Sequence, residues 1–107
     1  MKFLSPEFTH QDHRRTISQL FTAPIHQVNR YDVKKDAVLG DHYHKETREY
    51  FLITKGSFII QYGNYKSKLF TAKAVNKGDY FVVEPYEKHT IECMSQEGQF
   101  LTFLTKS

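Results

Sequence analysis

Residues 41–49 read DHYHKETRE, and this stretch decides both the fold and the chemistry that we predict for the chain. Side chains alternate between the two faces of a β-strand, so a strand over 41–44 places His42 and His44 on the same face. The polar residues 45–48 are typical of a loop between two strands. If the chain turns there, Glu49 returns to the face of the histidines, followed at period 2 by Phe51 and Ile53.

A third imidazole lies further along the chain, in the segment PYEKHTIEC over residues 85–93. Period 2 places His89, Ile91 and Cys93 on one face of a strand, so this histidine is expected on an otherwise apolar inner surface. Imidazole and carboxylate together are the ligands of divalent zinc, iron, manganese, nickel or copper. The sequence therefore predicts one divalent transition-metal site, and its ligands are His42, His44, Glu49 and His89.

The remainder of the chain consists of short apolar runs separated by turn residues. We predict strands over 26–33, 41–44, 48–54, 57–62, 66–73, 79–84, 89–94 and 98–105. Eight short strands at spacings near ten residues are typical of a sandwich or barrel. Gly56 separates two apolar runs and predicts a turn, and Gly63-Asn64 is typical of a two-residue hairpin turn.

Composition limits the function classes that remain. The chain has 107 residues, 15 Lys and Arg against 12 Asp and Glu, and a net charge of +3. The basic residues are scattered, whereas a nucleic-acid surface needs them clustered, so we expect no nucleic-acid partner. A single cysteine favours a reducing compartment. Without a signal peptide or a long apolar run, we expect a cytoplasmic protein that does not bind a membrane.

The spacing of these residues resembles the two sequence motifs of the cupin superfamily. The first motif is a His-x-His, then a Glu five residues after the second His, then a Gly seven residues after the Glu; it is matched by His42, His44, Glu49 and Gly56. The second, a Gly and a later Pro and His, is matched by Gly78, Pro85 and His89. The chain departs from the family at Asp36 and Tyr86, where glycine is usual. The resemblance covers about residues 26–105.

This resemblance implies an all-β fold, a cupin or jelly-roll β-barrel in a single domain. We expect an N-terminal arm over residues 1–25 and the cupin barrel over residues 26–107. An arm together with open sheet edges favours a homodimer, as is common in this family. The expected partner is a small-molecule ligand or substrate held inside the barrel.

A second, narrower resemblance concerns residues 40–58, GDHYHKETREYFLITKGSF, which are similar to the dTDP-keto-sugar 3,4-isomerases. In that group the paired histidines act as acid and base without a metal. Glu49 argues for a metal, because the group often lacks a carboxylate at the matching position.

Three hypotheses therefore remain for the function. The first is a metal-dependent enzyme that acts on a small polar molecule as an oxygenase, isomerase or lyase. The second is a metal-independent isomerase or epimerase of a nucleotide-linked keto sugar, in which His42 or His44 is the acid or base. The third is a cupin that binds a small ligand without turning it over. The sequence alone does not identify a catalytic residue.

Overall fold

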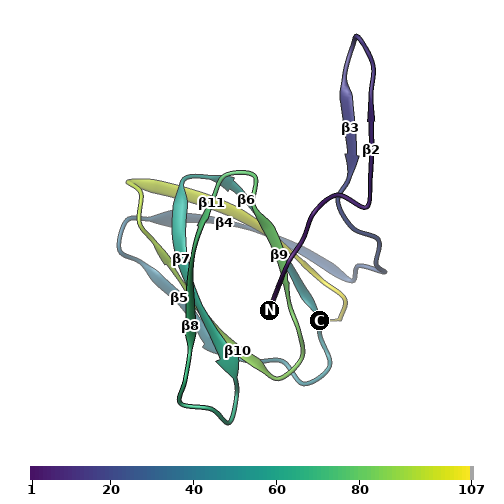
Figure 1. Cartoon of the computed structure of the whole chain (residues 1–107). Coiled ribbons are helices and arrows are strands. Elements are labelled where there is room, and N and C mark those ends of the chain that lie inside the picture. The colour runs from purple at the N-terminus through teal and green to yellow at the C-terminus, as the bar shows by residue number, and fades with distance from the viewer. Residues whose placement is uncertain (107) are drawn as a thin grey trace.

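A computed structural model describes residues 1–106 of the chain, and all of its regular elements are antiparallel strands. Two sheets face each other and enclose the core, while a separate hairpin stands away from them (Figure 1). The larger sheet has the order β1 (Lys2–Phe3), β9 (Tyr80–Val83), β6 (Glu49–Lys55), β11 (Glu97–Leu104) and β4 (Gln27–Lys34). The smaller sheet has the order β5 (Val38–His42), β10 (Glu87–Cys93), β7 (Ser57–Asn64) and β8 (Thr71–Asn76). The all-β jelly-roll prediction is confirmed.

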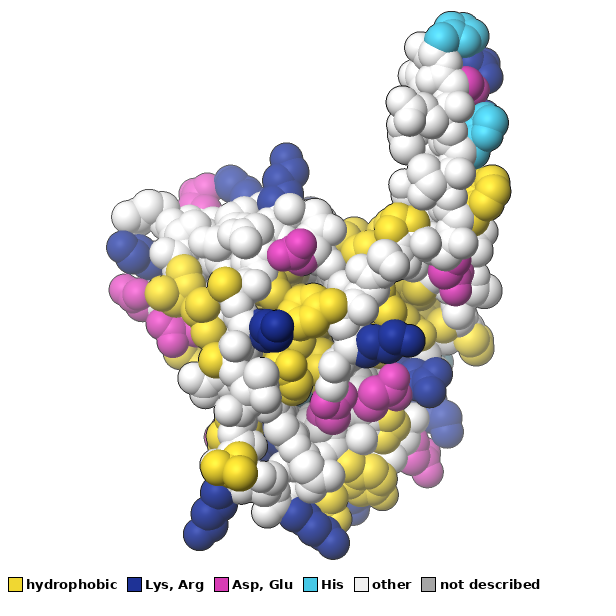
Figure 2. Space-filling model, in the orientation of Figure 1, with side chains coloured by type: hydrophobic (Ala, Val, Ile, Leu, Met, Phe, Trp, Pro, Cys, Tyr) yellow, Lys and Arg dark blue, Asp and Glu magenta, His cyan; other side chains and the backbone are white. Residues whose placement is uncertain are grey.

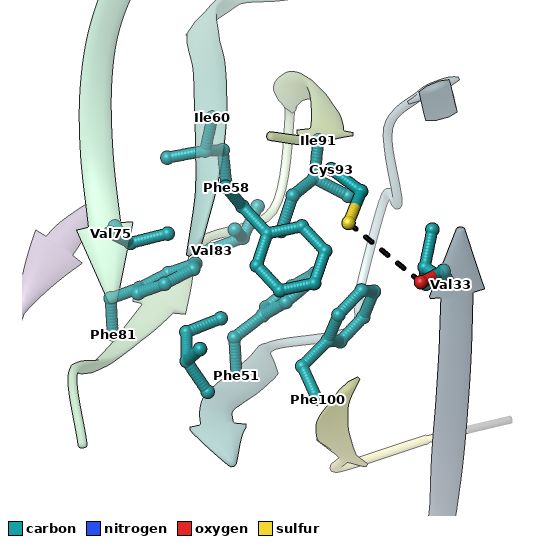
Figure 3. Packing of buried hydrophobic residues seen from close by; sticks show 11 residues of the cluster. Val33, Phe51, Phe58, Ile60, Val75, Phe81, Val83, Ile91, Cys93 and Phe100 are labelled. Carbon is teal, nitrogen blue, oxygen red and sulfur yellow. Dashed lines mark hydrogen bonds between the residues drawn. The ribbon is translucent and has the colours of Figure 1, made fainter. Parts of the chain in front are cut away.

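The core lies between the two sheets and is rich in aromatic rings (Figure 3). Phe100 on β11 is at its centre, because its ring lies 5.5 Å from that of Phe51 and 5.3 Å from that of Phe58, between centroids. The remaining buried members are Val33, Ile53, Ile60, Val75, Phe81, Val83, Ile91 and Cys93. Alternation on β10 is as predicted, since Ile91 and Cys93 are buried on the same face.

One predicted turn is wrong. Gly63 and Asn64 lie within β7, where they pair with Lys88 and Glu87 of β10. The chain turns only afterwards, because the side-chain oxygen of Asn64 accepts a hydrogen bond of 2.9 Å from the backbone N–H of Lys66 and so stabilises a local turn there. The next strand, predicted over 66–73, consequently begins later, at Thr71. The turn predicted at Gly56 is confirmed, and that residue has a positive φ of 78°.

The first 25 residues contain two different structures. β1 pairs with β9 and forms one edge of the larger sheet. β2 (Phe8–Gln11) and β3 (Thr16–Gln19) pair only with each other, and all their residues are exposed. Phe21, which follows this hairpin, stacks on Tyr50 on the outer face of the larger sheet, with ring centroids 4.0 Å apart. Over the described residues, no helix has the length and hydropathy that a membrane span requires.

Candidate functional site

A β-bulge on β5 places the first histidine of the site. His42 is opposite His89, and Gly40 is opposite Thr90, so Asp41 is left without a partner on β10. Gly40 and Asp41 both have positive φ values, 102° and 67°. A Cβ atom on Gly40 would lie 2.7 Å from the carbonyl oxygen of His89, so this position needs glycine for space as well as for conformation. The bulge turns His42 toward the barrel interior.

The predicted strand over 41–44 is therefore wrong in detail. β5 ends at His42, and His44 lies in the loop that follows. The two imidazoles nevertheless converge, with ring centroids 5.1 Å apart. They meet because of the bulge and the loop, and not through the simple alternation that the sequence suggests.

The four predicted ligands lie together at the end of the barrel. One donor atom each from His42, His44 and Glu49 lies within 4.8 Å of the other two. Oε1 of Glu49 lies 3.3 Å from Nε2 of His44 and 3.7 Å from Nε2 of His89. Donors that share one ion with bonds of about 2.1 Å are roughly 3–4 Å apart. The two Glu49 distances have this spacing, whereas the group of His42, His44 and Glu49 has the wider limit of 4.8 Å and does not include His89. His89 joins the group through Glu49 and through its ring contact with His42, 4.9 Å between centroids.

Burial shifts the pKa values of the ionisable side chains at this site. Glu49 is 5% exposed, and desolvation raises its pKa to about 6, an effect that the nearby His42 partly opposes. His89 is 2% exposed, and its pKa falls to about 4, first because of desolvation and then because of repulsion from His42. Desolvation also lowers the pKa of His44. The buried imidazole of His89 is therefore neutral at pH 7, and its lone pair is available to a ligand.

Tyr31 is part of the site, although the sequence analysis did not include it. It lies on β4 opposite Phe100, and the two rings stack with centroids 4.7 Å apart. Burial, and then the negative charge of Glu49, raise the pKa of its hydroxyl, so Tyr31 is a protonated donor. The only signal in the sequence is its place in the alternating strand over 26–33, and many other aromatic residues share that pattern.

A cavity of about 60 Å³ connects these residues. Its wall on the larger sheet carries Tyr31, Glu49 and Phe100, and its wall on the smaller sheet carries His42 and His89. Both β4 and β5 are edge strands of their sheets, and they flank the cavity without pairing. An imidazole and a phenol therefore face one small space from opposite sides.

Glu49→Gln is expected to stabilise the protein when a chelator is present. Burial raises the pKa of Glu49 in the folded state, so the folded protein holds the carboxyl proton more tightly than the unfolded chain does. The stabilisation that this proton gives is present below about pH 4.5 and is lost as the pH rises through about 6. The uncharged Gln avoids this loss, so the variant should gain about 2 kcal/mol at pH 8 and almost nothing at pH 4.5. Urea unfolding at both pH values measures the difference. An equal gain at both values would contradict a desolvated carboxylate.

The chain belongs to the cupin family, because the family model described as Cupin matches residues 15–107. A comparison with curated proteins found none that matches the chain. Among solved structures the fold is shared with several proteins of sugar metabolism, all of low sequence identity.

WlaRA of Campylobacter jejuni, a TDP-fucose-3,4-ketoisomerase, has a TM-score of 0.76 and 15% identity over 100% of this chain and 84% of its own. ChmJ of Streptomyces bikiniensis, a 3'-monoepimerase solved with dTDP, has a TM-score of 0.78 and 13% identity over 100% of this chain and 68% of its own. CapF of Staphylococcus aureus, a capsular polysaccharide assembling protein, has a TM-score of 0.73 and 18% identity over 94% of this chain. The chain spans only 30% of the length of CapF.

Proposed function

We propose that this protein is an isomerase or epimerase of a nucleotide-linked keto sugar. The observation that carries the proposal is that the side chains of His42 and Tyr31 line one cavity from different sheets. Moving a proton at a carbon next to a carbonyl needs a base at the carbon and a donor at the oxygen. The ketoisomerase and the epimerase that share this fold support the substrate class.

The proposed reaction consists of proton transfers at carbon and at the neighbouring oxygen, and it needs no external oxidant. His42, the exposed imidazole at the cavity, takes the proton from the carbon beside the carbonyl. The electron pair of the broken C–H bond forms a C=C bond, and the former carbonyl oxygen takes a proton from the Tyr31 hydroxyl. In epimerisation a proton returns to the other face of the same carbon, and the enol oxygen gives its proton back to Tyr31 as the carbonyl re-forms. In isomerisation a proton is delivered to the former carbonyl carbon, and the hydroxyl on the carbon that first lost its proton gives up its O–H proton as it becomes the new carbonyl, which restores Tyr31. Oε1 of Glu49 lies 3.3 Å from Nε2 of His44, and this contact holds His44 beside the base, His42.

Exchange of substrate hydrogen with solvent tests this function directly. The protein is incubated in deuterium oxide with a panel of dTDP-, UDP- and GDP-linked 4-keto sugars, and the products are analysed by NMR. Deuterium next to the carbonyl, together with a new isomer, is expected for at least one member. Neither deuterium nor a new isomer with any member would overturn the proposal and favour a cupin that only binds a ligand.

A metal-dependent enzyme is the second candidate, and the donor set favours it. Three imidazoles surround a buried carboxylate that has no Lys or Arg ion pair among the described residues. A buried carboxylate is costly without a cation. His42, His44, Glu49 and His89 would hold the ion, which would act there as a Lewis acid on a substrate oxygen.

Elemental analysis of protein purified without a histidine tag or chelator separates the two candidates. About one equivalent of iron, manganese, nickel, copper or zinc per chain is expected for the metal-dependent enzyme. His44→Ala should then remove most of the metal while the barrel remains folded, and His26→Ala, a change at an exposed histidine, should not. Unchanged metal content in His44→Ala would contradict the ligand assignment.

We also propose a homodimer in which the β2–β3 hairpin of each copy packs against the other. The hairpin stands clear of its own barrel, as Figures 1 and 2 show. An isolated two-stranded hairpin is only marginally stable in water, so its order needs a covering surface. The pairing places Phe8 and Ile17 on the same face, 58% and 41% exposed. The division into an arm over 1–25 and a barrel over 26–107 remains part of this proposal.

Analytical ultracentrifugation at micromolar concentration tests the dimer. The wild type is expected to sediment as a dimer, and a Phe8→Asp, Ile17→Asp double variant as a folded monomer, because buried charges disfavour association. Thr9→Asp, on the opposite face of the hairpin, is the matched control and should remain dimeric. A monomeric wild type would contradict the proposal.

A further inference from the structure

Three tyrosine rings gather at one end of the barrel, beside the candidate site. The ring of Tyr65 lies 4.7 Å from that of Tyr43 and 5.2 Å from that of Tyr86, and the latter two are 6.2 Å apart, all between centroids. Tyr43 is 37% and Tyr86 is 42% exposed. These residues come from three separate loops, after β5, after β7 and before β10, at the lower end of the barrel in Figure 1. We name this group the tyrosine cluster.

The tyrosine cluster is joined to the candidate site through the backbone. Tyr43 lies between His42 and His44 in sequence. The backbone N–H of Tyr86 donates a hydrogen bond of 2.7 Å to the carbonyl of His44, and the N–H of Tyr65 donates one of 2.9 Å to the carbonyl of Tyr86. A ligand that touches these rings therefore lies within reach of the histidines.

Tyr86 is an unusual residue for its position. Its φ is 66°, a left-handed conformation that glycine adopts freely and bulky side chains adopt rarely. Such strain persists only when another interaction favours the side chain, and it is concentrated at functional sites. The ring of Tyr86 packs beside Tyr43 and Tyr65 and is still 42% exposed, so a large part of its surface is open to a ligand. The ring is therefore placed to contact a ligand as well as its two neighbouring tyrosines.

The charge and the size of the site indicate the ligand. Nζ of Lys66 lies 5.5 Å from the centre of the Tyr65 ring, which places a cation on the tyrosine cluster. The cavity of about 60 Å³ is too small for a whole nucleotide-linked sugar, so only the reacting end of such a molecule fits inside. The nucleotide must lie outside the cavity, where exposed aromatic rings and a nearby cation suit a base and a phosphate.

We infer that the tyrosine cluster binds the nucleotide of the substrate, with the base stacked on Tyr43 or Tyr86 and the diphosphate near Lys66. This inference rests on the proposed function and adds the location of the nucleotide. It assigns to Tyr86 a role in binding that accounts for its strained backbone.

Calorimetric titration of the full chain with dTDP, UDP and GDP tests the inference. Tyr86→Gly removes the ring and relieves the backbone, so the variant is expected to remain folded while its affinity for the bound nucleotide falls at least about tenfold. Asp36→Gly is the matched control, because Asp36 also has a positive φ, 70°, and lies outside the tyrosine cluster. The control should retain the wild-type affinity.

A second variant separates the base from the phosphates. Lys66→Gln should weaken binding of the nucleoside diphosphate several-fold and leave binding of the corresponding nucleoside unchanged. If Tyr86→Gly binds the diphosphate as tightly as the wild type, or if the wild type binds none of the three, the inference is wrong. Binding that depends on Tyr86 without any turnover of a keto sugar would leave the inference standing and overturn the proposed function. If the wild type turns over a keto sugar but Tyr86→Gly binds the nucleotide as tightly as the wild type, the proposed function stands and the inference is wrong.

Discussion

His42→Asn is expected to lower kcat/KM for the keto-sugar reaction by about 10³-fold while leaving the barrel folded. His42 is an exposed residue whose imidazole lines the cavity, and Tyr31 lines the same cavity from the other sheet. Asn fits the same place and keeps a polar group, but it cannot accept a proton from carbon near neutral pH. Binding of the substrate should change much less than turnover, because only the proton-transfer step is lost.

The measurement is steady-state kinetics on the sugar that shows deuterium exchange, with and without a chelator. His13→Asn, in the exposed loop between β2 and β3, is the control and should have wild-type activity. Equal losses with His42→Asn and with chelator treatment of the wild type would favour the metal-dependent enzyme. Activity within threefold of the wild type would contradict the assignment of His42 as the base.

Phe100→Ala is expected to be the most damaging core substitution, with a loss of about 3–5 kcal/mol in the free energy of unfolding. The ring is 2% exposed and contacts the rings of Tyr31, Phe51 and Phe58. Truncation removes its apolar contacts and leaves a cavity that residues from both sheets cannot fill without moving. Such a loss is a large fraction of the stability of a domain of this size.

Urea unfolding measures this loss, and Phe70→Ala is the control because the Phe70 ring is 49% exposed. The control should change stability by less than about 0.5 kcal/mol. Phe100→Ala should also lower activity in the fraction that remains folded, since the stacked Tyr31 loses its support. A loss below about 1 kcal/mol in the free energy of unfolding would contradict this expectation and show that neighbouring side chains repack into the space left by the ring.

The sequence predicted the parts of the fold that follow from alternation. On β6 and β10 the predicted inner residues are buried, because each strand pairs on both sides and has one face toward the core. The loop between His44 and Glu49 was also predicted, since four polar residues separate an apolar strand from the histidines. These features depend on hydrophobicity at period 2, which a single sequence displays.

The rest depended on tertiary contacts that no local pattern reveals. The bulge at Gly40 and Asp41 exists because β5 pairs with β10 in a shifted register, and the sequence carries only a glycine as a signal. Tyr31 enters the site because β4 is hydrogen-bonded to β11 beside Phe100. Both facts concern which strands become neighbours, and this was not predictable from the residues of either strand alone.

The gap between β4 and β5 has a mechanical consequence. These two edge strands belong to different sheets and share no ladder hydrogen bonds, so the sheets can separate along this seam while each ladder remains intact. Opening this seam costs only side-chain contacts, as at the other junction between the two sheets, where the edge strands β1 and β8 also do not pair. The side chains that line the cavity along this seam, Tyr31 and Leu39 among them, would have to move for the cavity to widen. For the keto-sugar enzyme that we propose, we expect the side chains along this seam to decide how large a ring the cavity admits.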